Sequence, residues 1–268
     1  MTVAPSPTPL PTPLGRRPSL VRSAQALLSL SMARTFTPVL SLAMLALVLL
    51  PMPFAWLWAS RATADSDPVS FLVSNFDRLI LAVVTPIIAL LMGTSAFSAD
   101  AEDGTLLYLV TTTTPRRWIA AVRVLFAALV TAALAAISTY GTGLVTTGVA
   151  DPDNVRRAFA IAAAFGGATY AALFTLLALT MRRALVAGLG YVLFWEGILS
   201  TTFPAIKYLS VRQWMLSVAN ALMANSEDRV STGPSVTASL IAAVLVFVLA
   251  IVIGGRRLHQ PRISRIGT

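Results

Sequence analysis

The chain has 268 residues, of which 56% are hydrophobic and only 12% are charged, and its formal net charge at pH 7 is +9. Such an apolar composition excludes an ordinary soluble globular domain and indicates a membrane protein. The sequence contains no cysteine, which excludes disulfide bridges, thiol nucleophiles and thiolate metal sites.

The amino-terminal part holds six prolines among residues 4–18. Because a proline-rich stretch favours an extended backbone and cannot pack a core, residues 1–18 are predicted to form a disordered cytoplasmic tail. Residues 19–34 instead place Leu20, Leu27 and Leu28 at helical spacing, which favours an amphipathic helix lying on the membrane surface. The alternative interpretation is that this helix simply extends the first membrane span.

Six later segments are long and apolar enough to cross a bilayer, which takes roughly 20 mainly apolar residues for about 30 Å of hydrocarbon. They run approximately over residues 36–59, 79–97, 118–140, 158–180, 184–203 and 236–254. These runs lack the period of two that β-barrel strands show, so an all-α membrane protein with a six-helix transmembrane domain at 35–255 is predicted. Pro51, Pro53 and Pro86 predict kinks or early helix ends. Small residues in FGGATYAA, at 165–172, would let the fourth helix approach its neighbours closely.

Basic residues are distributed unevenly between the two sides of this bundle. With the amino terminus inside, the inner pieces carry thirteen arginines against three acids, and the outer pieces carry seven basic and seven acidic residues. The positive-inside rule therefore places both termini, including the basic tail at 256–268, in the cytoplasm. The net charge then reflects topology and contact with anionic membrane lipid, so nucleic acid is not expected as a partner.

The long outer segment between spans five and six carries a helical pattern of its own. Over residues 211–224, apolar side chains including Trp214 fall on one face, whereas Arg212 falls on another. This pattern predicts short outer helices lying at the interface, with the indole of Trp214 at headgroup level. The functional interpretation is a cap or gate on a transport pathway, and the alternative is a plain interfacial anchor.

Glu196 is the one acidic residue within a predicted span. A carboxylate at that depth is costly, so it is expected to face protein, water or a cation, with Lys207 or Arg212 as its partner. The functional interpretations are substrate contact, a proton relay or a gate latch. The structural alternative is an ion pair that fixes the outer helices against span five.

Catalytic chemistry finds little support in the sequence. Lys207 is the only lysine and does not lie in a P-loop pattern, so this chain does not bind and hydrolyse ATP by that route. His259 is the only histidine and has no companion ligand, which argues against a metal site or a histidine relay. The chain is accordingly not expected to be an enzyme, nor to hold a cofactor or a metal.

The stretch FSADAEDGTLLYLVTTTTPRRW, at 97–118, lies between spans two and three on the cytoplasmic side of the predicted topology. The acids Asp100, Glu102 and Asp103 precede an apolar run, and a short amphipathic helix broken around Gly104 would leave both kinds of side chain exposed. Acids facing anionic lipid are unfavourable, which disfavours a helix lying on the inner leaflet. A docked protein partner is the better interpretation.

The run from residue 97 to residue 123 resembles the ABC-2 type exporter permease family, in which span two is followed by a glutamate, Gly-Thr-Leu, a leucine-rich run, a proline and a basic residue. The corresponding residues here are Glu102, Gly104, Thr105, Leu106, Leu107, Pro115 and Arg116 or Arg117. The resemblance extends to the six spans, the cytoplasmic termini, the surface helix and the outer helices. Two departures are Arg123, where the family often has a lysine, and the proline-rich leader.

The resemblance implies a transmembrane permease subunit of an ABC exporter in the bacterial inner (plasma) membrane. Two permease chains, identical or related, would pair with two cytoplasmic ATPase subunits that bind ATP and magnesium, and the segment after span two would be the coupling helix. The residues implied in coupling are Asp100, Glu102, Asp103, Gly104, Thr105, Leu106, Tyr108, Pro115 and Arg116. The candidate pathway or gate residues are Glu196, Lys207, Arg212 and Trp214.

A different class stays open at this level, namely a secondary transporter that uses Glu196 as an intramembrane ion or proton site. Such a transporter is usually built from matched halves with broken helices, and no inverted repeat is evident in the sequence. The spans are rich in Ala, Leu, Val and Thr, a composition that suits lipids, apolar drugs and peptides equally well as cargo.

Overall fold

The computed structural model describes residues 37–102, 115–181, 183–199, 203–224, 230 and 232–257. The predicted tail at 1–18, the predicted surface helix at 19–34 and residues 258–268 lie outside this part. Every regular element within it is a helix. The helices are α2 (Pro38–Leu49), α3 (Pro51–Arg61), α4 (Pro68–Asn75), η1 (Phe76–Val84), α5 (Thr85–Glu102), α7 (Arg116–Thr147), η2 (Pro152–Asn154), α8 (Val155–Thr180), α9 (Ala184–Gly190), η3 (Tyr191–Leu199), η4 (Pro204–Leu209), α11 (Val211–Leu222) and α12 (Val236–Arg257).

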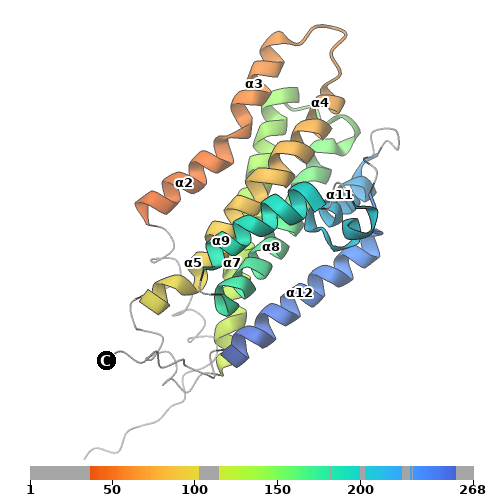
Figure 1. Ribbon diagram of the computed structural model, residues 1–268. Helices are drawn as coiled ribbons and strands as arrows, with labels where there is room; N and C mark the ends of the chain where they lie inside the picture. Colours follow the sequence, from red (N-terminus) through yellow and green to blue (C-terminus); the bar gives the residue numbers. More distant parts are fainter. Residues whose placement is uncertain are drawn as a thin grey trace, which may run out of the picture.

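Several of these helices join into longer rods (Figure 1). α2 and α3 form one rod that is interrupted at Pro51, the first residue of α3, so the predicted kink of the first span is confirmed. α4, η1 and α5 continue directly into one another, which makes a second rod from Pro68 to Glu102. Pro86 does not end this second rod, because it lies in the first turn of α5 just after the π-helical η1.

Five helices are long and apolar enough to cross a membrane, namely Pro38–Arg61, Pro68–Ser95, Arg117–Thr147, Val155–Thr180 and Val236–Arg257. An all-helical fold of the membrane type is therefore confirmed for the described residues. The predicted count of six spans is not confirmed, because the helix in the place of the fifth, Ala184–Leu199, is shorter. The described part of this helix has 7 residues in α9 and 9 in η3, and residues 200–202, which follow it, lie outside the described part.

The second and third long helices extend further than the sequence predicts. The second begins at Pro68 because Asp67 caps it, accepting hydrogen bonds from the Val69 and Ser70 N–H groups at 2.9 Å and 3.2 Å. The third, α7, has 32 residues and is about 48 Å long. The charged residue Asp77 interrupts the apolar pattern in the sequence, but the helix runs through it because its charge is paired in the fold.

The core of the bundle forms around α8, which packs on α5, α7, α11 and α12. Tyr170 and Phe174 of α8 and Phe76 of η1 are among its largest fully buried side chains. Small residues allow close packing, since a Cβ at Gly167 would lie 3.2 Å from Cγ2 of Thr131 in α7. The close helix contacts predicted from FGGATYAA are thereby confirmed.

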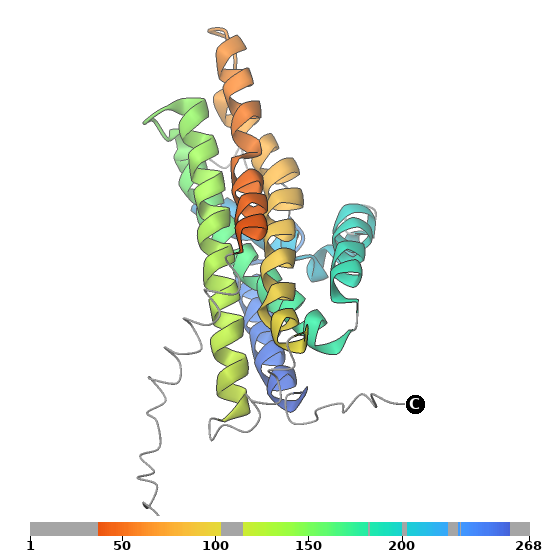
Figure 2. The ribbon, with the colours of Figure 1, turned by 90° about the vertical axis from the view of Figure 1, so that its left-hand side faces the viewer.

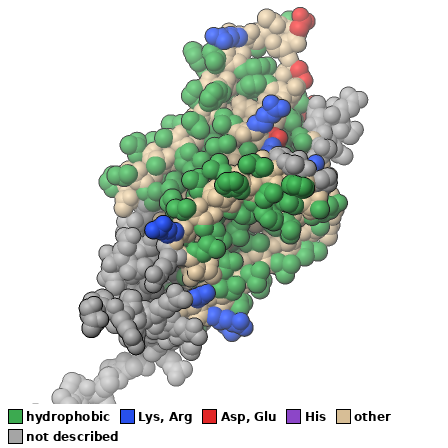
Figure 3. Space-filling view, in the orientation of Figure 1, with side chains coloured by type: hydrophobic (Ala, Val, Ile, Leu, Met, Phe, Trp, Pro, Cys, Tyr) green, Lys and Arg blue, Asp and Glu red, His purple; other side chains and the backbone are tan. Residues whose placement is uncertain are grey.

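The surface shows a separation of charged and apolar side chains. In Figure 3 the charged side chains gather toward the two ends of the face shown, and hydrophobic side chains cover most of the area between them. α12 and the α2–α3 rod are the least covered of the five long helices. Only 17% and 22% of an 18-residue apolar stretch in each of them is buried. Figure 2 shows α9 and η3 standing at the edge of the bundle. This distribution suits a bundle surrounded by lipid.

Candidate functional site

The predicted coupling segment is described only at its two ends. α5 continues to Glu102 without a break, so the backbone of Asp100 and Glu102 belongs to the last described turn of this helix. Pro115 is the exposed N-cap residue of α7, and Arg116 is the first residue of that helix. The predicted coupling residues Asp103, Gly104, Thr105, Leu106 and Tyr108 lie outside the described part. The first part of the predicted short helix is therefore an extension of α5, and it lies toward the same end of the bundle as the start of α7 (Figures 1 and 2).

Glu196 lies in η3, and only 2% of its surface is exposed. Its Oε1 accepts hydrogen bonds from the Tyr191 hydroxyl (3.0 Å) and the Val211 N–H (2.9 Å), and its Oε2 accepts one from the Ser210 hydroxyl (2.5 Å). Val211 is the first residue of α11, so the carboxylate faces a helix amino terminus, where the backbone N–H groups carry partial positive charge. Three donors and the helix end together explain why a carboxylate is tolerated at this buried position.

Arg212, in the first turn of α11, binds Asp77 of η1 with two hydrogen bonds. Its Nε donates to Asp77 Oδ1 (3.0 Å) and its Nη2 donates to Asp77 Oδ2 (2.7 Å). The two side chains are only 15% and 17% exposed. Arg212, one of the two predicted partners of Glu196, therefore pairs with a different acid, and none of the three hydrogen bonds described for Glu196 comes from Lys207. Lys207 lies in η4 and packs closely on Gly233, since a Cβ added to this glycine would lie 3.0 Å from the Lys207 Cβ.

α11 is the predicted outer helix, but it is covered on its polar as well as its apolar face. Residues 213–219 are all buried, because α8, α12, η1 and η4 pack around them. Met215 fills a notch at Gly166 of α8, where a Cβ would lie 2.1 Å from Met215 Cγ. The indole N–H of Trp214 donates to the Tyr208 carbonyl at 2.9 Å. Trp214 is only 5% exposed and packs within the protein, which differs from the indole at headgroup level that the sequence predicts. The position of α11 relative to a membrane stays a prediction.

Asp77, Glu196, Ser210 and Arg212 together form what we call the α11 anchor. Ser210 acts twice in it, since its hydroxyl oxygen also accepts the Gln213 N–H (3.2 Å) and so caps α11. Both acids lie in π-helical segments, η1 and η3, and such segments are frequent at functional sites. The anchor joins the second rod and the α9–η3 helix to a single turn of α11. Sequence reasoning identified Glu196 and Arg212 but missed Asp77, although the helix-cap signal before α4 could have extended the second helix through it.

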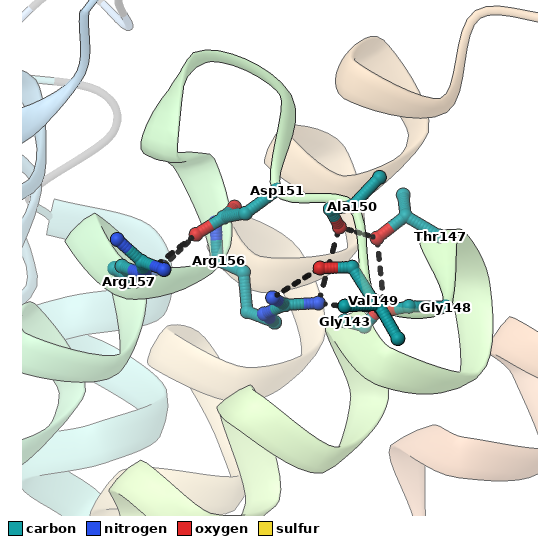
Figure 4. A network of polar contacts seen from close by, with 8 residues as sticks. All are labelled: Gly143, Thr147, Gly148, Val149, Ala150, Asp151, Arg156 and Arg157. Atoms are coloured by element: carbon teal, nitrogen blue, oxygen red, sulfur yellow. Dashed lines mark hydrogen bonds and ion pairs between the residues drawn. The ribbon is translucent and has the colours of Figure 1, made fainter.

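Arg156 at the start of α8 fixes the corner between α7 and α8 (Figure 4). Its Nη1 donates to the carbonyls of Gly148 (2.8 Å) and Ala150 (3.2 Å), and its Nη2 donates to the carbonyl of Val149 (3.2 Å). The guanidinium carbon also lies 4.7 Å from the centre of the Tyr140 ring. These carbonyls follow the carboxyl end of α7, which is the partially negative end of that helix. Sequence reasoning counted Arg156 only as a loop charge, whereas the fold uses it as a buried cap.

The comparisons with known proteins add no identity to these findings. No family model matches the chain, and no curated protein matches it. Within the described residues, no group of three or more histidine or acidic side chains could hold a metal ion. The fold and the α11 anchor therefore define the class of protein by themselves. It is an all-helical bundle of the membrane type, in which a short buried helix is tied to two other elements by one ion pair and one capped carboxylate.

Proposed function

We propose that the chain is the transmembrane permease subunit of an ABC-2 type exporter and is driven by a separate cytoplasmic ATPase. The observation that carries the proposal is the uninterrupted helix α5, which carries Asp100 and then Glu102, the first residue of the family-like motif, at the last described turn of the second rod. At this position they would lead directly into the remaining motif residues, as a coupling helix after the second span requires. The resemblance of the motif and the membrane-type bundle both support this assignment.

The second rod gives the proposed transporter a mechanical connection. From Pro68 to Glu102 it would measure about 50 Å with an α-helical rise. Near one end, Asp77 holds Arg212 of α11, and the other end carries the acidic motif. A movement that an ATPase imposes at Glu102 would be carried along a continuous helix to α11. Coupling further requires that the ATPase binds two permease conformations with different affinities, because a contact that is equal in both states shifts no population.

The exposed apolar faces support the proposed surroundings. Val39, Leu42 and Trp56 of the α2–α3 rod are 80%, 68% and 65% exposed, so lipid or a second permease chain is proposed to cover them. The proposed location is the bacterial plasma membrane, with both termini in the cytoplasm. Arg183 and Arg257 are exposed at the end that this orientation places inside, which agrees with the positive-inside rule.

The alternative, a secondary transporter with Glu196 as its ion or proton site, is less well supported. The three hydrogen bonds from Tyr191, Ser210 and Val211 already use most of the acceptor capacity of this carboxylate. The same bonds give Glu196 a structural task, since they hold the first turn of α11.

Co-expression with an ABC ATPase subunit from the same organism, followed by co-purification, tests the proposal. Charge reversal at the motif, Glu102→Lys with Asp103→Lys, is expected to reduce recovery of the ATPase to background while membrane insertion stays intact. The matched control is Asp65→Lys, an exposed acid in the loop between α3 and α4, which is expected to leave recovery unchanged. Equal recovery with the double variant and the wild type would overturn the coupling assignment, and so would equal losses with the double variant and the control.

A further inference from the structure

Three exposed arginines meet where the first turn of α7 lies beside the last turn of α12. Arg117 belongs to α7, and Arg256 and Arg257 end α12. The two helix ends lie side by side in both Figure 1 and Figure 2. Their contact is close because α12 has a glycine there: a Cβ at Gly255 would lie 2.7 Å from Arg117 Cγ. The stem of Arg117 is therefore held against α12, next to the glycine that precedes the other two arginines in the chain. We call these three residues the arginine cluster.

The arginine cluster differs electrostatically from the opposite end of the bundle. At that end Asp77 binds Arg212, and Asp151 lies 3.5 Å from the Nε of Arg157. No ion pair within the described residues includes a member of the arginine cluster. Like charges at two neighbouring helix ends repel one another. A ligand that brings negative charge to this place offsets the repulsion and is attracted by all three residues.

An apolar surface begins next to the arginine cluster. Leu249 and Leu245 stand seven and eleven residues before Arg256, so they lie on the same face of α12, and both are about half exposed. Trp118, which follows Arg117 on α7, is also exposed, and a tryptophan beside basic residues is typical of the headgroup level of a membrane. Positive charge with an apolar stripe beside it fits an amphiphile with an anionic head and acyl chains, whereas a soluble anion or an acidic protein face would use only the charge.

We propose that the arginine cluster and the adjoining face of α12 bind an anionic glycerophospholipid. Its phosphate would lie among Arg117, Arg256 and Arg257, and its acyl chains would run along Leu249 and Leu245. Basic pockets between helix ends are a known form of anionic-headgroup recognition. The bound lipid joins the ends of α7 and α12 and holds this end of the bundle in the leaflet that contains anionic lipid. The inference does not rest on the proposed function, since any membrane protein with this bundle would bind in the same way.

Lipid binding to the full chain in detergent tests the proposal. The protein is titrated with dioleoylphosphatidylglycerol or with dioleoylphosphatidylcholine, and native mass spectrometry gives the dissociation constant of the first bound lipid. Phosphatidylglycerol is expected to bind more tightly, and added salt is expected to weaken its binding. The triple variant Arg117→Gln, Arg256→Gln, Arg257→Gln is expected to lose about a hundredfold in affinity for phosphatidylglycerol, at about fivefold for each arginine near the surface. Its affinity for phosphatidylcholine is expected to be unchanged.

Two variants and one further ligand separate this proposal from its alternatives. Arg61→Gln removes an exposed arginine that ends α3 and is expected to leave the affinity unchanged. The triple lysine variant of the arginine cluster keeps the charge and is expected to retain most of the binding, which separates loss of charge from loss of fold. Glycerol phosphate, which has no acyl chains, is expected not to bind measurably.

Several results would overturn the lipid assignment. Equal affinities of the wild type for the two lipids would do so, as would equal losses with Arg61→Gln and with the triple glutamine variant. Binding of glycerol phosphate as tight as that of the lipid would indicate a site for free phosphate. Unchanged lipid affinity of the triple glutamine variant, combined with loss of ATPase co-purification, would assign the arginine cluster to a protein partner instead.

Discussion

The ion pair between Asp77 and Arg212 is expected to contribute measurably to the stability of the bundle. Breaking a fully buried pair costs about 3–5 kcal/mol, whereas an exposed pair contributes about 0–1 kcal/mol. The two side chains are 15% and 17% exposed and form two hydrogen bonds of 3.0 Å and 2.7 Å. We therefore expect Asp77→Asn and Arg212→Gln each to lower the free energy of unfolding by about 2 kcal/mol, between these limits.

A double-mutant cycle isolates the interaction from the other effects of each substitution. Once one partner is gone the second substitution removes an unpaired charge, so the double variant should be more stable than the sum of the single effects predicts, by about 1–2 kcal/mol. The assay is thermal unfolding of the detergent-solubilised chain, followed by circular dichroism. For chains of this size the melting temperature falls by about 2–4 °C for each kcal/mol of destabilisation. Each single variant is therefore expected to melt about 4–8 °C lower than the wild type.

A second pair provides the matched control for this cycle. Arg157 lies 3.5 Å from Asp151 but is 66% exposed, so Arg157→Gln is expected to change the stability by less than about 0.5 kcal/mol. Strictly additive effects of the Asp77 and Arg212 substitutions would refute the reasoning, because they would show that the two side chains do not stabilise one another. If Arg157→Gln lowered the free energy of unfolding as much as Arg212→Gln does, burial would not decide how much an ion pair stabilises the bundle.

Three further predictions concern α11 and the orientation of the bundle. Glu196→Gln keeps an acceptor for the start of α11 and should lower the free energy of unfolding by about 1 kcal/mol. Glu196→Ala leaves three buried donors without this acceptor and should lower it by about 2–4 kcal/mol, as measured by thermal unfolding. Gly166→Leu should destabilise by about 1–3 kcal/mol through its clash with α11, and Gly190→Ala, with nothing within 4 Å of its added Cβ, should not. A cysteine at the almost fully exposed Val149 should react with an impermeant thiol reagent on intact cells, and one at Arg183 should not.

Each of these three predictions has a contradicting result. Equal stability of the Gln and Ala variants of Glu196 would show that its carboxylate does not hold α11. A stable Gly166→Leu variant would mean that α11 does not pack as closely on α8 as the structure shows. Labelling at Arg183 but not at Val149 would reverse the proposed orientation, and the cysteine-free background ensures that each signal comes from a single position.

The helical character of the fold could be predicted from the sequence, whereas the length and path of individual helices could not. Long apolar runs without a period of two leave only helices that satisfy their own backbone in lipid. The apolar run of the predicted fifth span includes FWEGIL, but its described part is divided into the α-helical Ala184–Gly190 and the π-helical Tyr191–Leu199, a change that the run itself does not signal. The burial of α11 depends on contacts between distant parts of the chain, such as Arg212 with Asp77, which are 135 residues apart. A helical pattern in one window carries no information about such partners.

The role of Glu196 shows how far the sequence can specify the candidate site. Its position in an apolar run already requires compensation for a buried carboxylate, and a positively charged side chain is the most direct expectation. Among the described contacts, the fold supplies the amino terminus of α11 and two hydroxyl groups to Glu196, while Arg212 binds Asp77. Two acids from two π-helical segments thus act on one helical turn. The position of α11 consequently depends on both segments together, and a shift of either one relative to α8 would change how α11 is held.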